Sequence, residues 1–195
     1  MSQLVAAVSS SPEHTFSKPN VASIKLIAGI GVEGDAHSGE LIKHRYLVRR
    51  DSTQPNLRQV HLIHQELFAL LGDQGHHVEA GQLGENITTA GIDLLSLPTG
   101  TVLRIGSGTT LELTGLRNPC VQINDFQAGL MKLLRYRDNE GDLVRICGVM
   151  AVVLVGGVVR PDDEIAVELP PEPHHPLAYI LDSHHPRPNP GDQRP

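Results

Sequence analysis

The short stretch Arg117-Asn118-Pro119-Cys120 holds the residues best suited to chemistry in this sequence. A cysteine next to an arginine and just before a predicted helix experiences positive potential, which lowers the thiol pKa and favours the thiolate. The thiolate is the form that attacks electrophiles, carries a persulfide sulfur or binds a soft metal ion. A buried structural cysteine is the common alternative, and the position of Cys120 alone leaves both interpretations open. The second cysteine, Cys147, leads into an apolar run and is expected to lie in the core.

Positive charge is concentrated in one segment, residues 43–64, of a chain whose formal net charge is -6. Asp51 is the only acidic residue in this segment, and the basic residues are Lys43, Arg45, Arg49, Arg50 and Arg58. Such a segment in an acidic protein favours a small anion as ligand, although a solvated basic surface fits the pattern equally well. His61 and His64 fall in a strand-like run, where residues three apart point to opposite faces. We therefore expect core or phosphate-contacting histidines; a zinc site would need further ligands that the sequence does not place.

Two glycine-rich stretches can bring polar groups close to a ligand. The first, residues 29–34, matches the pattern GxGxxG, but the residues after it favour a turn and lack the helix of a dinucleotide fold. We expect this loop to place backbone amides and His37 near the ligand. The second, residues 81–89, has glycines that permit close approach of the backbone. Asn86 and Thr88 can hydrogen-bond a ligand there, unless the stretch is an ordinary turn.

The sequence pattern indicates mostly β structure. Apolar alternation or continuous apolar runs predict strands at 5–8, 21–27, 60–63, 149–155 and 165–167, and a hairpin at 101–105 and 111–114. One helix is predicted over 65–71, ended by Gly72, and a second from Asn124 to near Arg135, with Asn124 and Gln127 in capping-box spacing. Many strands, few helices and no βαβ rhythm indicate a mainly β (α+β) fold, a β-barrel or rolled sheet with a few peripheral helices.

Length and composition fit one domain of ordinary size with a tail. The chain has 195 residues, of which 39% are hydrophobic, enough to form a core and too many for a disordered chain. Residues 1–169 are expected to form the domain. Residues 170–195 hold eight of the 14 prolines and four of the 11 histidines. We expect an extended appendage there, with an apolar patch at 177–181 that can dock on the body.

Composition also narrows the classes of function. Aromatic residues make up 3% of the chain and the net charge is negative, which argues against binding of nucleic acid. No apolar run approaches the roughly 20 residues that cross a membrane. The first 16 residues lack the pattern of a secretory signal. Two cysteines cannot form a disulfide framework, so a cytoplasmic location is expected.

Five stretches, in this order, resemble the MOSC domain, the module found at the C-terminus of molybdenum cofactor sulfurases. They are residues 31–39 (GVEGDAHSG), 60–63 (VHLI), 84–94 (GENITTAGIDL), 117–120 (RNPC) and 148–157 (GVMAVVLVGG). The resemblance spans roughly residues 20 to 168. Each stretch is short, and the order of the five, including a loop cysteine after Arg-x-Pro, makes the resemblance specific.

The resemblance implies a MOSC-type β-barrel that holds an anionic pterin molybdenum cofactor. It assigns to Cys120 the role of metal ligand or persulfide carrier. In the mechanism that we expect, Arg117 lowers the thiol pKa and meets phosphate or substrate charge. Asn86 and Thr88 would hydrogen-bond the pterin or the substrate. The anionic end of the ligand would be held by His37, Lys43 and Arg45.

Members of the family differ in activity, and three hypotheses follow for this chain. In the first, the protein binds the molybdenum cofactor or carries sulfur as a persulfide on Cys120, for delivery to a metal–sulfur cluster or cofactor. In the second, it is a molybdenum-dependent oxidoreductase that reduces N-hydroxylated compounds. In the third, it is a non-catalytic binding module in which Cys120 is structural. The substrate and the oligomeric state stay open.

Sulfur or electrons would have to come from another protein, so the expected partner is a cysteine desulfurase or an electron-donor protein. The family's desulfurases use pyridoxal phosphate, which links the family to pyridoxal phosphate binding. The 195 residues contain neither an aminotransferase-like domain with a Schiff-base lysine nor the extra N-terminal barrel of larger members. Asp162 stands where the family often has glycine, and aspartate tolerates turn conformations.

Overall fold

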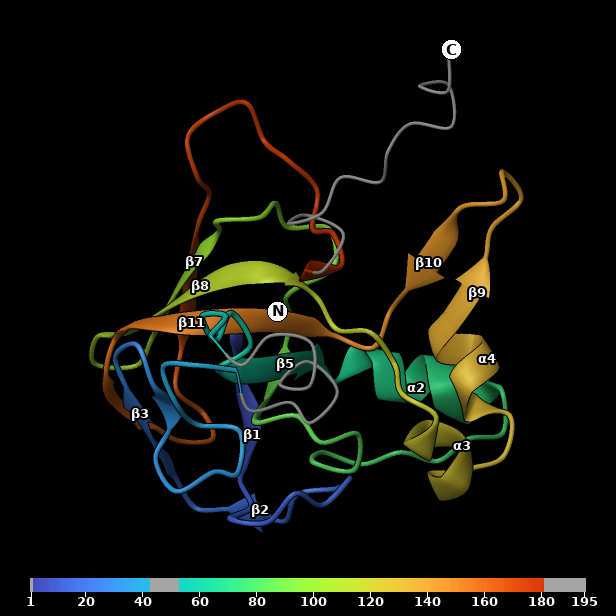
Figure 1. The fold of residues 1–195 in the computed structure, drawn as a ribbon, viewed down its shortest axis with the longest axis horizontal. Helices are drawn as coiled ribbons and strands as arrows, with labels where there is room; N and C mark the ends of the chain where they lie inside the picture. Colours follow the sequence, from blue (N-terminus) through green and yellow to red (C-terminus); the bar gives the residue numbers. More distant parts are fainter. Residues whose placement is uncertain (1, 43–52, 181–195) are drawn as a thin grey trace.

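The computed structural model describes residues 2–42 and 53–180, which form a mainly β fold with a few short helices (Figure 1). The strands are β1 (Leu4–Ser9), β2 (Asn20–Val21), β3 (Ile24–Ile27), β4 (Gly31–Val32), β5 (Val60–His64), β6 (Ile87–Ala90), β7 (Val102–Ile105), β8 (Thr109–Leu116), β9 (Arg135–Arg137), β10 (Leu143–Arg145), β11 (Val149–Val155), β12 (Gly157–Val159) and β13 (Ile165–Glu168). The helices are α2 (Glu66–Asp73), α3 (Gln122–Phe126) and α4 (Leu130–Leu134). The prediction of a mainly β chain is confirmed.

Eight strands form one mixed sheet in the order β13-β7-β8-β11-β5-β6-β1-β2. All neighbours in this order are antiparallel except β5 and β6, which run parallel. A second sheet has the order β12-β3-β4, and β9 pairs with β10 as a separate hairpin. The central position of β11 between β8 and β5 brings the ends of these three strands together, and this is where the site described below is built.

The β1 and β13 ends of the large sheet approach each other through isolated contacts. Leu4 on β1 forms an isolated bridge with Glu164, next to β13. Ile165 N also donates a hydrogen bond to Gln3 O at 2.9 Å. The expectation of a β-barrel is therefore met in part: the mixed sheet is present, but no regular strand pairing among the described residues closes it.

The predicted strands are largely present, with differences that have local causes. The run 21–27 is split, since β2 ends at Val21 and β3 begins at Ile24. β11 follows its predicted bounds, but Leu154 and Val155 are 45% and 51% exposed, so only its first part is buried on both faces. β6 falls in the stretch predicted as a loop; its four residues are all buried, and its β-branched threonines suit a strand.

The helix predictions need two corrections. α2 continues past Gly72 to Asp73, and Gly75, with a φ of 82°, provides the left-handed turn after it. The predicted second helix is two short helices, α3 and α4, separated at Gly129, which has a φ of 89°. Asn124 is not the N-cap of α3. It lies inside α3, and its Oδ1 accepts a hydrogen bond at 3.2 Å from Met131 N in the first turn of α4.

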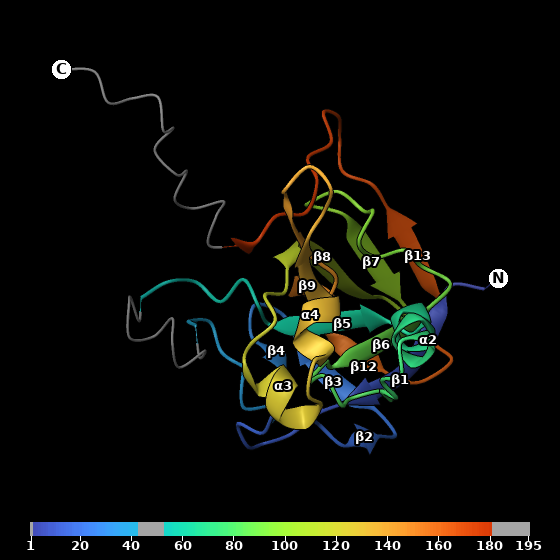
Figure 2. The same ribbon diagram turned by 90° about the vertical axis from the view of Figure 1, so that its right-hand side faces the viewer.

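The short helices and the β9–β10 hairpin gather at one end of the sheet (Figures 1 and 2). Beneath them lies a second hydrophobic cluster, separate from the main core of the sheet, and it includes the fully buried Cys147. The expectation that Cys147 lies in the core is confirmed. Among the described helices, none is long and apolar enough to cross a membrane.

Position 162 shows why an aspartate can replace the family's usual glycine. Asp162 has a φ of 70°, in the left-handed region that glycine adopts most easily. Its backbone N–H donates to Val5 O at 2.8 Å, which fixes this turn against β1. Aspartate is among the residues that adopt this conformation at low cost, so the turn is kept.

The C-terminal segment returns to the body at the end of β8 (Figure 1). Leu177 and Ile180 are 7% and 5% exposed, and Leu116 N donates to Ala178 O at 2.8 Å. The apolar patch predicted at 177–181 therefore docks through its described residues. The division at residue 169 between domain and tail stays a prediction.

Candidate functional site

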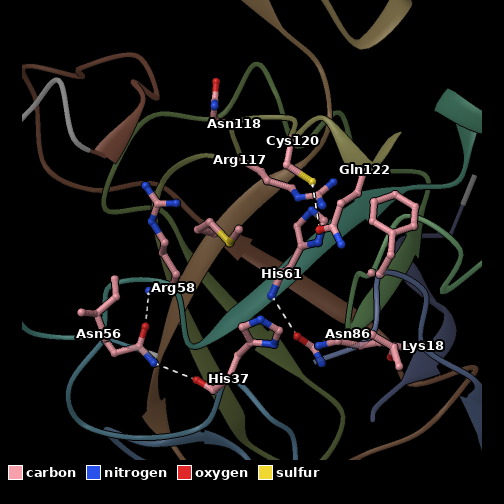
Figure 3. A pocket seen from close by; sticks show the side chains of 15 residues that line it. Lys18, His37, Asn56, Arg58, His61, Asn86, Arg117, Asn118, Cys120 and Gln122 are labelled. Carbon is pink, nitrogen blue, oxygen red and sulfur yellow. Dashed lines mark hydrogen bonds between the residues drawn. The ribbon is translucent and has the colours of Figure 1, made fainter. Parts of the chain in front are cut away.

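A cavity of about 140 Å³ lies where β5, β11 and the end of β8 meet four loops. It brings together four predicted site residues, His37, Asn86, Arg117 and Cys120. The other lining residues are Thr15, Phe16, Lys18, Ile42, Asn56, Arg58, His61, Gly84, Asn118, Gln122 and Met150. Figure 3 shows Cys120, Arg117 and Gln122 on one side of the cavity and Arg58 and Asn56 on the other.

Cys120 is a partly exposed thiol on the wall of this cavity. It lies in the loop that follows β8, two residues before the start of α3. Its Sγ donates a long hydrogen bond to Gln122 Oε1, at 3.6 Å. The sulfur is therefore accessible from the cavity and is not packed into the aliphatic core.

Arg117 contacts the other cysteine. Its Nη1 donates to Cys147 Sγ at 2.7 Å, and its backbone N–H donates to Gly148 O at 3.0 Å. Burial raises the pKa of the Cys147 thiol, and the nearby Arg117 offsets this only in part. Cys147 is thus a neutral thiol at pH 7 and does not itself offset the positive charge of Arg117. Arg117 was predicted to lower the pKa of the Cys120 thiol; the thiol to which it donates a hydrogen bond is that of Cys147.

A buried ion pair lies at the wall of the cavity, to which Lys18 contributes. Lys18 Nζ is 2.7 Å from Asp35 Oδ2, and the two side chains are 4% and 2% exposed. Asp35 also accepts hydrogen bonds from Asn86 Nδ2 (3.0 Å) and from His37 N (3.0 Å). Burial acts to raise the pKa of Asp35, but the hydrogen bonds from His37 and the charge of Lys18 outweigh it and hold the pKa well below its usual range. For Lys18, burial lowers the pKa more than the ion pair raises it.

Asn86 connects this ion pair to β1 and β5. Its Nδ2 donates to Asp35 and to Ser9 O (3.2 Å), and its Oδ1 accepts from His61 N (3.3 Å). Its amide is therefore engaged within the protein, so a contact with a ligand would come in addition to these bonds. Thr88 donates to Glu85 Oε1 at 3.2 Å and is not among the cavity-lining residues. Lys43 and Arg45 lie outside the described residues.

The second glycine-rich stretch packs against the chain itself. Gly84 has a φ of 83°, and a Cβ there would lie 2.6 Å from Phe16 O. The glycine thus lets residues 84–86 pack against the loop that carries Phe16 and Lys18 into the cavity. Glu85 is fully buried beside it, and burial raises the pKa of its carboxyl, opposed by a hydrogen bond from Gly81 N.

The two histidines on β5 have different surroundings. His61 lines the cavity, and burial lowers its pKa well below the usual value, so it is neutral at pH 7. Its Nε2 lies 2.9 Å from Cys147 O and donates to it in the neutral form. Burial also lowers the pKa of His64, which lies outside the cavity. Across residues 2–42 and 53–180, no cluster of three His, Cys, Asp or Glu side chains is placed to hold a metal ion.

Two cations of the site were not singled out by the sequence patterns. Arg58 belongs to the basic segment, but the sequence pattern does not distinguish it from the other basic residues of that segment. In the described part of the chain, its buried Nε and Nη2 atoms have no hydrogen-bond partner. Lys18 lies between Ser17 and Pro19 in a loop, with no motif around it. Arg58 and Arg117 thus line a cavity whose described lining residues include no acid, an arrangement that suits an oxyanion, whereas the charge of Lys18 is paired with Asp35.

The chain belongs to the MOSC domain family, whose model matches residues 49–166. This confirms the resemblance carried by the five sequence stretches. A comparison with curated protein sequences gives no match.

Solved structures share the fold. The YuaD protein from Bacillus subtilis is similar with a TM-score of 0.70 and 21% identity, covering 88% of this chain and 98% of that chain. YiiM from Geobacillus stearothermophilus has a TM-score of 0.64 and 17% identity, covering 93% of this chain and 83% of that chain. YiiM from Escherichia coli has a TM-score of 0.59 and 18% identity, covering 90% of this chain and 73% of that chain.

The family connects this chain to the molybdenum cofactor, whereas pyridoxal phosphate binding by the chain is not supported. Lys18 is the only lysine among the described lining residues, and its Nζ is held in the ion pair with Asp35. A Schiff base needs a lysine amine that is free to react, so this cavity does not offer one in its described part.

Proposed function

We propose that this MOSC domain protein binds an anionic pterin molybdenum cofactor in the cavity, with Cys120 Sγ as the protein ligand of the metal. The observation that carries the proposal is the placement of one accessible thiol and two arginines, Arg58 and Arg117, around one cavity. A soft molybdenum centre prefers a thiolate ligand, and the phosphate of the pterin cofactor prefers guanidinium and ammonium groups. We also propose that the large sheet corresponds to the β-barrel of the MOSC family.

The residues present fit such a group. The buried Nε and Nη2 of Arg58 have no partner among the described residues and are donors that a phosphate oxygen can satisfy. Asp35, the acid that contacts Lys18 and His37 of the cavity wall, is already paired with Lys18 and so repels an anion less. The described residues offer one thiol and no cluster of metal-binding side chains. One protein ligand is enough for a metal whose other sulfur ligands come from the pterin. When bound, the cofactor would supply the redox or sulfur chemistry of molybdenum.

The side chains would divide the work of binding. Arg58 and Arg117 would hold the oxyanion with charge-assisted hydrogen bonds. His37 would lie at the anionic end of the ligand, together with Lys43 and Arg45 of the basic segment. Asn86 and Thr88 would stabilise the walls of the site, since their polar groups already have partners in the protein. Cys120 would present its sulfur from the opposite side of the cavity to Arg58 (Figure 3).

The second candidate function is sulfur carriage on Cys120. The observation that favours it is the partial exposure of the thiol, which a donor protein can reach. A cysteine desulfurase would be the partner and the cytoplasm the location. An electron-donor protein would replace the desulfurase if the bound cofactor reduces N-hydroxylated compounds.

Pterin content tests the proposed cofactor site. Protein purified from a host that makes molybdenum cofactor is expected to release about one pterin per chain on acid oxidation, measured by fluorescence and mass spectrometry. The same protein from a host unable to make the cofactor serves as the control. A pterin content at the level of that control would contradict the proposal.

A further inference from the structure

The C-terminal segment contacts Arg58, which lines the cavity, through one aromatic side chain. Residues 176–179 run beside β8, where Tyr179 forms a parallel bridge with Leu116 and Ala178 O accepts the Leu116 N–H. Gly115 is needed for this contact, because a Cβ there would lie 2.5 Å from Ala178 O. Segment and strand are thus in backbone contact, and Tyr179 is carried to the point where β8 ends and the cavity loop begins.

The ring of Tyr179 lies next to two guanidinium groups. The Cζ of Arg58 is 5.2 Å from the ring centroid, and the Cζ of Arg145 is 4.9 Å from it. Arg58 lines the cavity, and Arg145 Nε donates to Asn118 Oδ1 at 3.1 Å, on the cavity wall. A cation near an aromatic face is attracted by the negative potential of the ring, more strongly where the pair is shielded from water.

The ring of Tyr179 is a contact that can restrain the Arg58 side chain. Its backbone N–H is fixed by Asn56 Oδ1 at 3.1 Å, but the hydrogen-bonding groups Nε and Nη2 of its side chain have no partner in the described residues. An arginine side chain without such a partner is free to change rotamer until it binds an anion. The conformational entropy that it then loses weakens the binding. A ring that restrains the side chain in advance removes part of that loss.

We infer that residues 176–180, beyond the matched family domain, support the ligand site from outside the cavity, and that Tyr179 is a positioning residue which holds Arg58 ready for an oxyanion. This inference rests on the proposed anion-binding function of the cavity. It makes the C-terminal segment a determinant of affinity for the phosphate end of the ligand, acting through Arg58 and without contact to the reacting sulfur.

Calorimetric titration with inorganic phosphate tests the inference on the full chain. Tyr179→Leu, which removes the ring, is expected to weaken phosphate binding about five- to tenfold. Tyr179→Phe keeps the ring and is expected to retain most of the affinity, within about twofold. If Tyr179→Leu does not fold, as judged by circular dichroism, Tyr179→Met carries the same expectation. Tyr136→Leu is the matched control, because Tyr136 is an exposed tyrosine of the β9–β10 hairpin that does not line the cavity.

The double variant separates action through Arg58 from a general effect. In an Arg58→Ala background, Tyr179→Leu is expected to cause no further loss of affinity, because the group that it positions is absent. An equal loss in both backgrounds, or wild-type affinity in Tyr179→Leu, would overturn the role of Tyr179 while leaving the anion site intact. A wild-type protein that does not bind phosphate would overturn the anion cavity itself, and with it both proposals.

Discussion

Replacing Asp35 with asparagine is expected to lower the free energy of unfolding by about 3–5 kcal/mol at pH 7. The variant leaves Lys18, whose side chain is 4% exposed, without the carboxylate that lies 2.7 Å from its Nζ. A buried charge without its counter-charge is far more costly than the pair itself. The same substitution replaces an acceptor of the Asn86 amide, so the loop that carries His37 loses support as well. Urea unfolding followed by circular dichroism measures the change.

The stabilisation from Asp35 has a defined pH range. Its pKa in the folded protein is below the ordinary value of about 3.9, so its contribution is fully present above that pH. The contribution is lost as the pH falls from about 3.9 through the folded-state pKa. The difference between wild type and Asp35→Asn should therefore be constant from about pH 5 to 7 and shrink in stronger acid.

An exposed ion pair provides the control for Asp35→Asn. Lys25 Nζ and Glu33 Oε1 are 2.8 Å apart, but the two side chains are 57% and 51% exposed. Glu33→Gln is expected to change the free energy of unfolding by less than about 1 kcal/mol, because water and salt screen this pair. Equal losses in Asp35→Asn and Glu33→Gln would show that burial gives the Lys18–Asp35 pair no special weight.

Arg117→Met is expected to weaken phosphate binding about ten- to a hundredfold, since hydrogen bonds to charged groups contribute about 1.5–3 kcal/mol each. Methionine fills much of the same space and removes the charge. The neutral Cys147 thiol, 2.7 Å from Arg117 Nη1, does not compensate that charge in the wild type. Arg117→Lys keeps the charge but not the fork of donors, so an intermediate affinity is expected. Calorimetric titration of the three proteins gives the comparison.

Arg104→Met is the control for Arg117→Met. Arg104 also carries a guanidinium, but it pairs with Glu168 on the surface between β7 and β13. Its loss is expected to leave phosphate affinity within about twofold of wild type, because screening weakens exposed charges at a distance. An affinity of Arg117→Met as high as that of Arg104→Met would remove Arg117 from the site.

The elements whose apolar pattern is local could be predicted from the sequence. The hairpin of β7 and β8 is such a case, because alternating residues flank the turn at Gly106. The break between α3 and α4 could not be read in the same way, since the apolar spacing continues across Gly129. β6 was missed because its polar threonines become buried only when the strand inserts between β1 and β5.

Residues of the candidate cavity that lie in short motifs could be predicted from the sequence. Residues that reach the cavity through long-range contacts could not. Cys120 and Arg117 lie in one motif, and His37 follows a glycine-rich loop, so both pieces of the cavity could be found. Lys18 acquires its place through an ion pair with Asp35, 17 positions away in the chain. The ring of Tyr179 reaches Arg58 from the far end of the described chain, and no local pattern connects them.

Molybdenum content and intact mass of wild type and Cys120→Ser test the central claim most directly. Wild type from a cofactor-producing host should contain about one molybdenum per chain, or gain about 32 Da, the mass of one sulfur, after incubation with a cysteine desulfurase. Cys120→Ser should show neither, whereas Cys147→Ser, which alters the fully buried thiol, should behave like wild type. Absence of both molybdenum and added sulfur from the wild type, or their retention in Cys120→Ser, would contradict the account.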